Sequence, residues 1–250
     1  KYINEEEYKT SIKKTIQIAS NKKKPIFSSD YYLEEIRKQI IKAYDEDFLY
    51  AGGLSVRSSL DISTQSIADL ALKSGLLEYD KRNGYRGVID SNTNKNWFNE
   101  YIGLNQPHNF LIAKVIKLNE LNGRVDIEVL KGKDVVKGHL SNFHWARKSL
   151  GNGYLGPKIN QANEVFNLDD IIHVSFKSDN LYNLEQIPEI NGGIIVMDPH
   201  TGRVFALSGG FDFNESNFNR VYQAKRQPGS SFKPFVYMAA LENGLQPNSL

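Results

Sequence analysis

Short β-rich runs follow one another closely in the middle of the sequence, and they restrict the possible folds more than any other feature. The runs are rich in β-branched and aromatic residues, and turns that contain glycine separate them. They are Phe110–Leu118, Arg124–Leu130, Val135–Leu140 and Asp170–Phe176, with turns at Asn122-Gly123 and Gly132-Lys133-Asp134. Closely spaced strands with such turns predict a small barrel or meander of the OB type.

Helical patterns precede this β-rich region. Apolar residues recur at helical spacing over residues 4–20, and a second apolar stripe over Tyr31–Tyr44 predicts another amphipathic helix. The segment Leu54–Leu60 alternates with period two, which predicts a strand, and Ser63–Leu77 returns to helical spacing. The first part of the chain is therefore expected to be mainly helical.

Two apolar runs after the β-rich region flank a turn. Gly193–Met197 and Arg203–Leu207 are joined through Asp-Pro-His-Thr-Gly, and this pattern predicts a β-hairpin whose strands belong to the core of a sheet. A last helix is predicted from Ser230 or Ser231 to about Asn243.

Charge and composition exclude several classes of protein. The 31 Lys and Arg residues nearly balance the 29 Asp and Glu residues, so no nucleic-acid partner is expected. The chain has no cysteine, which excludes disulfides, thiolate catalysis and Cys-based zinc sites. Neither a membrane span nor a signal peptide is predicted. Because the chain starts without Met at Lys1 and stops in a predicted loop at Leu250, we expect it to be a segment of a longer protein.

The histidines and tryptophans give no sign of a ligand site. The histidines are scattered and lack carboxylate partners at metal-ligand spacing, so we expect no metal and no cofactor. Trp97 and Trp145 are expected in the core of the barrel. The five histidines are His108, His139, His144, His173 and His200.

One short motif could carry nucleophilic chemistry. A serine nucleophile needs a nearby base, and a lysine three residues later on a helix lies on the same face. This spacing occurs three times, at Ser11/Lys14, Ser20/Lys23 and Ser230/Lys233. The first two lie in a lysine-rich region expected to be exposed, whereas Ser230 follows Pro-Gly and leads into an apolar stripe. On spacing alone, a helix N-cap remains the commoner explanation of such a serine.

The longer string around this serine is more specific. Arg226–Phe235, with the sequence RQPGSSFKPF, closely resembles the nucleophile segment of bifunctional class A penicillin-binding proteins. Other segments resemble parts of the same family. Gly192–Gly210 resembles its opening transpeptidase hairpin, Gly53–Asp61 with Gln65 resembles its linker strand and helix, and Ile3–Tyr8 resembles the segment after its glycosyltransferase domain. Tyr79–Gly87 followed by the OB-like insert is similar to the type 1a subgroup from Gram-negative bacteria.

The resemblance implies an α+β multidomain fold. It would consist of a helical linker, a small OB-like β-barrel insert and the incomplete N-terminal part of a penicillin-binding transpeptidase domain, which is serine β-lactamase-like. The expected units are residues 1–50, a helical linker after a missing glycosyltransferase domain; 51–87, a strand and helix leading into the transpeptidase; 88–185, the OB-like domain; and 186–250, the truncated start of the transpeptidase domain.

The resemblance also implies an activity. Ser230 would attack the D-Ala-D-Ala carbonyl of a peptidoglycan stem peptide, Lys233 would accept its proton, and the acyl group would pass to an amine of a neighbouring stem. β-Lactams would acylate the same serine. The parent protein would be anchored in the bacterial inner membrane with these domains at its periplasmic face, and it would also use lipid-linked precursors.

The chain departs from the family pattern after Lys233. The S-x-N and K-T-G elements that follow S-x-x-K in the family are missing there, and the upstream strings Ser178-Asp179-Asn180 and Lys73-Ser74-Gly75 stand in the wrong order and are interpreted as coincidences. We therefore expect this chain alone to be inactive. We also expect the 194–207 hairpin and the apolar face of the last helix to be exposed or covered by another chain.

Two other hypotheses concern the OB-like unit. It could be a regulatory module that binds a protein regulator or a glycan partner of a cell-wall synthase, which rests on fold type alone. An OB-type nucleic-acid binder would need a basic groove lined with aromatic side chains, and the balanced charge disfavours it.

Overall fold

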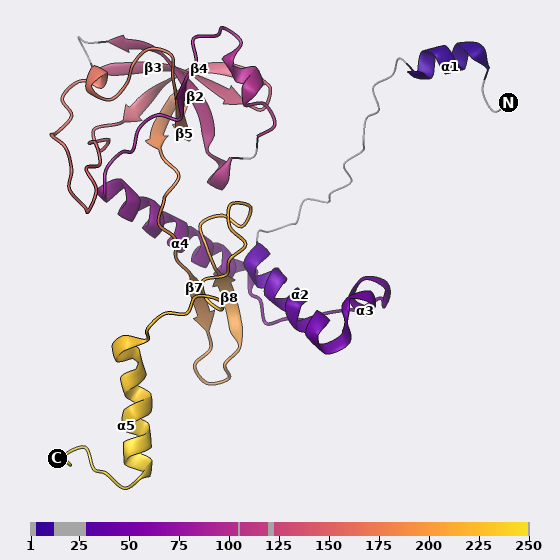
Figure 1. Ribbon diagram of the computed structural model, residues 1–250, viewed down its shortest axis with the longest axis vertical. Coiled ribbons are helices and arrows are strands. Elements are labelled where there is room, and N and C mark those ends of the chain that lie inside the picture. Colours follow the sequence, from indigo (N-terminus) through magenta and orange to yellow (C-terminus); the bar gives the residue numbers. More distant parts are fainter. Residues whose placement is uncertain (1–3, 13–28, 105, 120–122, 250) are drawn as a thin grey trace.

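The computed structural model describes residues 4–12, 29–104, 106–119 and 123–249 (Figure 1). Four helices come first: α1 (Glu5–Ile12), α2 (Asp30–Tyr44), α3 (Glu46–Ala51) and α4 (Ile62–Arg82). A barrel follows, and the described chain then continues through a hairpin of β7 (Ile194–Met197) and β8 (Val204–Ser208) to helix α5 (Lys233–Glu242). The predicted α+β fold class is confirmed.

Five strands close the barrel. They are β2 (Leu111–Asn119), β3 (Arg124–Lys131), β4 (Asp134–Asn142), β5 (Asp170–Ser178) and β6 (Leu181–Glu185). Their order is β5-β2-β3-β4-β6, and the last strand, β6, also pairs with the first, β5, which closes the barrel. All of these pairs are antiparallel except β4 with β6. The short strand β1 (Asp90–Ser91) also pairs with β5. The predicted OB-like barrel is confirmed.

The register of the barrel strands explains its apolar interior. Ala113 on β2 lies opposite Val129 on β3 and Ile172 on β5, and all three side chains are fully buried. Trp97, in the 3-10 helix η1 (Trp97–Glu100), is 1% exposed and packs in a second cluster that includes residues of β2, β3 and β5. Its predicted core position is confirmed. Trp145 is only partly buried, and it packs against the barrel core with its ring centroid 5.7 Å from that of Tyr85.

Helix α4 connects the barrel to the hairpin and runs from one to the other in Figure 1. It begins with a capped N-terminus, because the Asp61 carboxylate accepts a hydrogen bond from the backbone N–H of Thr64 at 2.7 Å. Beyond its last residue, Gly84 adopts a φ of +93°, and a Cβ there would lie 2.8 Å from the backbone oxygen of Arg147. A glycine is therefore required where the chain enters the barrel.

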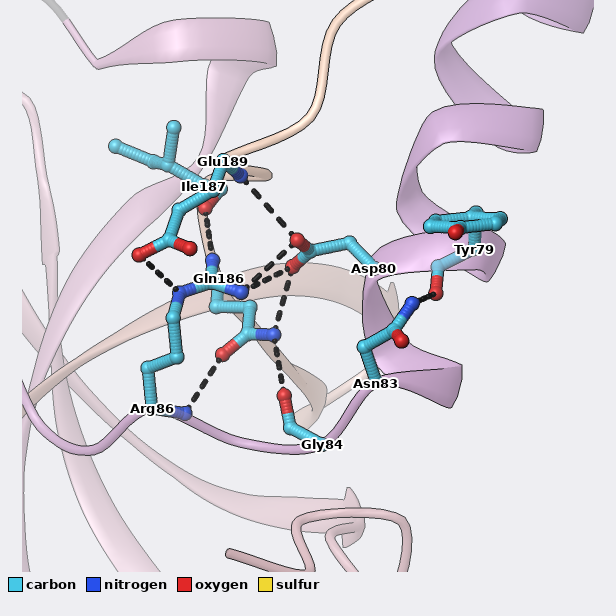
Figure 2. Close-up of polar contacts among 8 residues, drawn as sticks. All are labelled: Tyr79, Asp80, Asn83, Gly84, Arg86, Gln186, Ile187 and Glu189. Carbon is cyan, nitrogen blue, oxygen red and sulfur yellow. Dashed lines mark hydrogen bonds and ion pairs between the residues drawn. The ribbon is translucent and has the colours of Figure 1, made fainter. Parts of the chain in front are cut away.

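A polar network around the buried carboxylate of Asp80 fixes the C-terminal end of α4 to the segments that enter and leave the barrel (Figure 2). Its members are Asp80, Arg86, Gln186 and Glu189, which we call the Asp80 network. Nη1 of Arg86 donates to both carboxylate oxygens of Asp80, at 2.9 and 3.0 Å, and Nε2 of Gln186 donates to one of them at 2.7 Å. The backbone N–H of Glu189 donates to the other at 3.2 Å. Asp80 is 3% exposed, so this carboxylate is buried and fully hydrogen-bonded.

The other end of α4 is fixed to the hairpin by one side chain. The amide of Gln65, which is buried, donates to the carbonyl of Leu207 at 3.0 Å and accepts from its backbone N–H at 2.9 Å. Helix α2 packs on the same hairpin through Tyr32, whose hydroxyl donates to the carbonyl of Val204 at 2.9 Å. The hairpin is thus covered on one side by α2 and α4.

The predicted strand at Leu54–Leu60 is wrong, because this segment is irregular in the structure. Leu54 and Val56 are exposed, so their alternation with polar residues does not reflect a buried face. Only the end of the segment contacts β8, where the Ser59 hydroxyl donates to the carbonyl of Val204 and the backbone N–H of Asp61 to that of Phe205. Side chains here satisfy backbone groups that a strand partner would otherwise satisfy.

The remaining helix predictions differ from the structure mainly at their ends. The predicted helix over residues 4–20 is described only for α1, and its continuation after Ile12 lies outside the described residues. The helix predicted at Ser63–Leu77 is confirmed and extends to Arg82. Strand β6 was not predicted.

Candidate functional site

The candidate nucleophile lies at the start of the last helix. Gly229 has a φ of +56°, a conformation that glycine adopts without strain, and it leads into the 3-10 turn η4 (Gly229–Phe232). Helix α5 begins at Lys233, whose backbone N–H donates to the carbonyl of Ser230. Ser230 and Lys233 therefore lie on one continuous helical turn, which agrees with the predicted start of the last helix.

The side chains of these two residues are both exposed. Within the described residues, no hydrogen bond joins the Ser230 hydroxyl to the Lys233 ammonium. Residues three apart on a helix share a face, so a small change of rotamer can bring the two groups together. The local backbone thus presents a serine and a lysine at the required spacing, without an assembled nucleophile and base pair.

The surface around this turn is apolar. Phe232 and Phe235 lie with ring centroids 5.7 Å apart, and both are more than half exposed. The rest of α5 has no buried residue, and its exposed apolar side chains are Val236, Tyr237, Met238 and Leu241. Figure 1 shows α5 extending away from the hairpin and the barrel. An apolar helix so exposed is typical of a surface that another part of a protein covers.

The hairpin also exposes apolar side chains, on the strand β7. Ile195 and Met197 on β7 are 40% and 52% exposed. Among the described strands, β7 pairs only with β8, so the outer edge of β7 is open. Of the two alternatives expected, exposure or cover by another chain, exposure is found in this chain for the last helix and for two residues of β7, whereas Ala206, Leu207 and Ser208 of β8 are buried.

Two family models match the chain and together cover its barrel, hairpin and last helix. The model described as "Penicillin binding protein transpeptidase domain" matches residues 192–250. The model described as "Penicillin-binding protein OB-like domain" matches residues 85–190. The relatives named penicillin-binding protein 1A include those of Rickettsia prowazekii, 37% identical over 100% of this chain, and Pseudomonas aeruginosa, 32% identical over 100% of this chain. The chain belongs to the penicillin-binding protein 1A family.

A solved structure of the family agrees with the fold. The 2.6 Å crystal structure of penicillin-binding protein 1A from Haemophilus influenzae superposes with a TM-score of 0.70 at 27% identity, over 98% of this chain and 35% of that protein. The chain spans 30% of the length of both the Rickettsia and the Pseudomonas relatives. Within the described residues, every helix is too short or too polar to cross a bilayer.

The structure also brings together polar residues that the sequence analysis did not connect with one another. Gln65, Asp69 and Lys73 follow one another at intervals of four along α4 and line one cavity together with His108 and Asp212. The interval of four was a usable signal for a shared helix face. His108 and Asp212 are far away in the sequence, and no pattern connects them to α4.

Proposed function

We propose that this chain is part of a serine-type D,D-transpeptidase that crosslinks peptidoglycan. In this proposal Ser230 is the nucleophile that attacks the penultimate D-Ala carbonyl of a stem peptide, with release of the terminal D-Ala. Lys233 takes the hydroxyl proton, and the acyl-serine is then resolved by an amine of a neighbouring stem. The backbone N–H of Ser230 would supply one of the two oxyanion donors.

The observation that carries the proposal is the position of the serine. Ser230 follows a left-handed glycine, opens a helical turn with Lys233 three residues later, and lies inside the segment that matches the transpeptidase family model. The two other serine and lysine pairs of the sequence lie outside the described residues or at their edge.

The same proposal covers partners and location. Stem peptides, lipid-linked precursors and β-lactams would be ligands of the full-length protein, which would be anchored in the inner membrane and face the periplasm. The name shared by the relatives, penicillin-binding protein, supports the β-lactam part directly. No S-x-N or K-T-G motif occurs between Lys233 and Leu250, so we expect this chain alone to remain unacylated.

Labelling with a fluorescent penicillin tests the proposal. The probe is incubated with this chain and with a form extended to the full length of the relatives, and intact mass locates the adduct. We expect labelling of the extended form, loss of it in Ser230→Ala, and full labelling in the matched control Ser231→Ala. Labelling that survives Ser230→Ala would refute the assigned nucleophile, and an unlabelled extended form would refute the transpeptidase proposal.

A second function, docking of a regulatory protein on the barrel, has one supporting observation. Phe176 on β5 is 55% exposed, and Leu181 on the paired strand β6, next to the residue opposite Phe176, is 37% exposed. The ammonium of Lys131 lies 4.9 Å from the Phe176 ring centroid. A photoreactive residue at position 176 should crosslink to the partner in cells, and the same residue at the exposed turn position Lys133 should not. Equal crosslinking from both positions would remove this surface from consideration.

A further inference from the structure

A cavity of about 250 Å³ lies where four segments of the chain meet, and we call it the junction cavity. Its walls are the start of α2, one face of α4, the loop before β2 and the residues that follow β8. Ligand sites of small molecules begin at roughly 300 Å³, so this cavity suits a ligand of a few heavy atoms. It lies far along the chain from Ser230, and nothing in the proposed transpeptidase reaction requires it.

The α4 wall presents two residues of opposite charge that are not joined by an ion pair. Asp69 and Lys73 are four residues apart, a spacing at which carboxylates and ammonium groups commonly form an ion pair. Among the described residues, however, no ion pair within 4.0 Å joins them. Burial raises the pKa of the Asp69 carboxyl above its usual value and outweighs the opposing effect of hydrogen bonds from Ser208 and Gln65 and of the charge of Lys73. The Asp69 carboxylate already accepts a hydrogen bond from the Gln65 amide at 3.1 Å and has further acceptor capacity, whereas the Lys73 ammonium has no ion-pair or hydrogen-bond partner among the described residues.

The opposite wall adds a strained residue. His108 has a φ of +53°, in the left-handed region that side chains rarely adopt, and its backbone N–H donates to the Asp212 carboxylate at 3.4 Å. Burial and the charge of Lys73 lower the pKa of His108, so its ring is neutral at pH 7 and adds no positive charge. Such strain is retained where the surrounding structure enforces it, which happens most often at ligand sites.

A buried hydroxyl without a partner also lines the cavity. Ser29 is 3% exposed, and its Oγ has no hydrogen-bond partner among the described residues. Although Ser29 is the N-cap residue of α2, its side chain does not cap the helix. An unsatisfied buried hydroxyl is unfavourable, and a hydrogen bond to a ligand or a bound water would remove that cost.

The charges restrict the class of ligand. Three carboxylates, those of Asp30, Asp69 and Asp212, line the cavity with one ammonium, that of Lys73. A simple anion would be repelled by the carboxylates, and a simple cation would leave Lys73 without a partner. A metal ion is disfavoured, because the described residues contain no group of three His, Asp or Glu side chains that could hold one.

We propose that the junction cavity binds a small zwitterion with one ammonium and one carboxylate group, such as a free amino acid. The ligand ammonium pairs with the carboxylates of Asp69 and Asp212, and the ligand carboxylate pairs with Lys73. The Ser29 hydroxyl donates or accepts one further hydrogen bond. Because the four walls come from separate segments, binding also holds the barrel loop, α2, α4 and the hairpin together.

Calorimetric titration of this chain tests the proposal with D-alanine and L-alanine as zwitterions, and with propionate and ethylamine as probes that each carry one of the two charges. We expect at least one alanine enantiomer to bind with a Kd below about 1 mM and to raise the melting temperature. Propionate and ethylamine should bind at least tenfold more weakly, because each leaves one charge of the cavity unpaired.

Variants separate this site from general effects on folding. Lys73→Met keeps the length of the side chain and should weaken alanine binding at least tenfold, as should Asp69→Asn, whereas the exposed control Lys42→Met should not. Ser29→Ala, a smaller change, should weaken binding several-fold without unfolding the chain. Ser230→Ala should leave it unchanged, so this test is independent of the transpeptidase proposal. No binding of either enantiomer at about 20 mM, or equal binding of propionate and alanine, would overturn the proposal.

Discussion

Replacing Asp80 by alanine should destabilise the barrel strongly, because this carboxylate is the common acceptor of the Asp80 network. The variant removes the acceptor of the Arg86 guanidinium, of the Gln186 amide and of the Glu189 backbone N–H. Gln186 keeps its bond to the carbonyl of Gly84 and Arg86 keeps that to Ile187, so the loss is partial for both. Removing one partner of a buried ion pair costs about 3–5 kcal/mol, and we expect about 3 kcal/mol here because Arg86 reaches solvent.

Urea unfolding followed by tryptophan fluorescence measures this loss, since Trp97 and Trp145 both pack in the barrel. The matched control is Glu78→Ala, two residues earlier on α4, where the side chain is exposed and the free energy of unfolding should change by less than about 0.5 kcal/mol. Asp80→Asn should also destabilise the barrel, because its amide N–H₂ group would face donors.

A double-mutant cycle decides whether the network acts as a unit. Asp80→Ala combined with Arg86→Ala should cost at least about 1 kcal/mol less than the sum of the single variants, because each single variant already breaks the shared ion pair. A loss below about 1 kcal/mol for Asp80→Ala, or strictly additive effects, would refute the reasoning.

Three further predictions follow from single contacts. Gly75→Ala on α4 should stabilise the chain by about 0.5–1 kcal/mol, because the added Cβ meets nothing within 4 Å. Gly84→Ala should destabilise it, because this residue has a φ of +93° and the added Cβ would lie 2.8 Å from a backbone oxygen. In thermal unfolding, the two variants should shift the melting temperature in opposite directions. Gln65→Ala should lower the free energy of unfolding by about 3 kcal/mol, because it leaves the backbone N–H and C=O of Leu207 without partners. The rate of hydrogen exchange should rise for the hairpin amides and stay unchanged for those of the barrel. Burial lowers the pKa of His173 from 6.5 to about 4, so between these pH values the unfolded chain binds a proton that the folded chain does not, and stability is lost as pH falls from about 6.5 to about 4. His173→Gln should remove up to about 3 kcal/mol of this pH dependence of the free energy of unfolding, measured in urea titrations. An unchanged pH profile would contradict the assigned cause.

The sequence predicted the elements whose pattern is local. Strands β2, β3, β4 and β5 were identified because each is a short run rich in β-branched and aromatic residues and glycine-containing turns bound three of them. Strand β6 was missed because it has only five residues and takes its place by pairing in parallel with β4 and antiparallel with β5, which no local pattern records. The alternation at Leu54–Leu60 was misleading for the same reason, because a strand requires a partner edge and the segment meets β8 only at its end.

The candidate site was predictable to the same extent. The position of Ser230 at a helical turn follows from the local string. Whether its hydroxyl forms a hydrogen bond with Lys233, which it does not in the described residues, depends on what surrounds the turn. The Asp80 network and the junction cavity were not predictable. Asp80 and Gln186 are 106 residues apart, and Lys73 and Asp212 are brought to one cavity only by the way α4 crosses the hairpin.

Helix α4 fixes the distance and the orientation between the barrel and the hairpin. Gln65 near its start bonds the backbone of the hairpin, and Asp80 near its end bonds the segments that enter and leave the barrel. These two residues are about four helical turns apart, roughly 22 Å along the axis, and project about 60° from each other around it. A continuous helix transmits both the distance and the rotation, so the barrel cannot turn about α4 without breaking one of the two buried polar contacts. Because the hairpin leads directly into the chain that carries Ser230, the orientation of the barrel relative to the transpeptidase segment is set by α4 together with the contacts at its two ends.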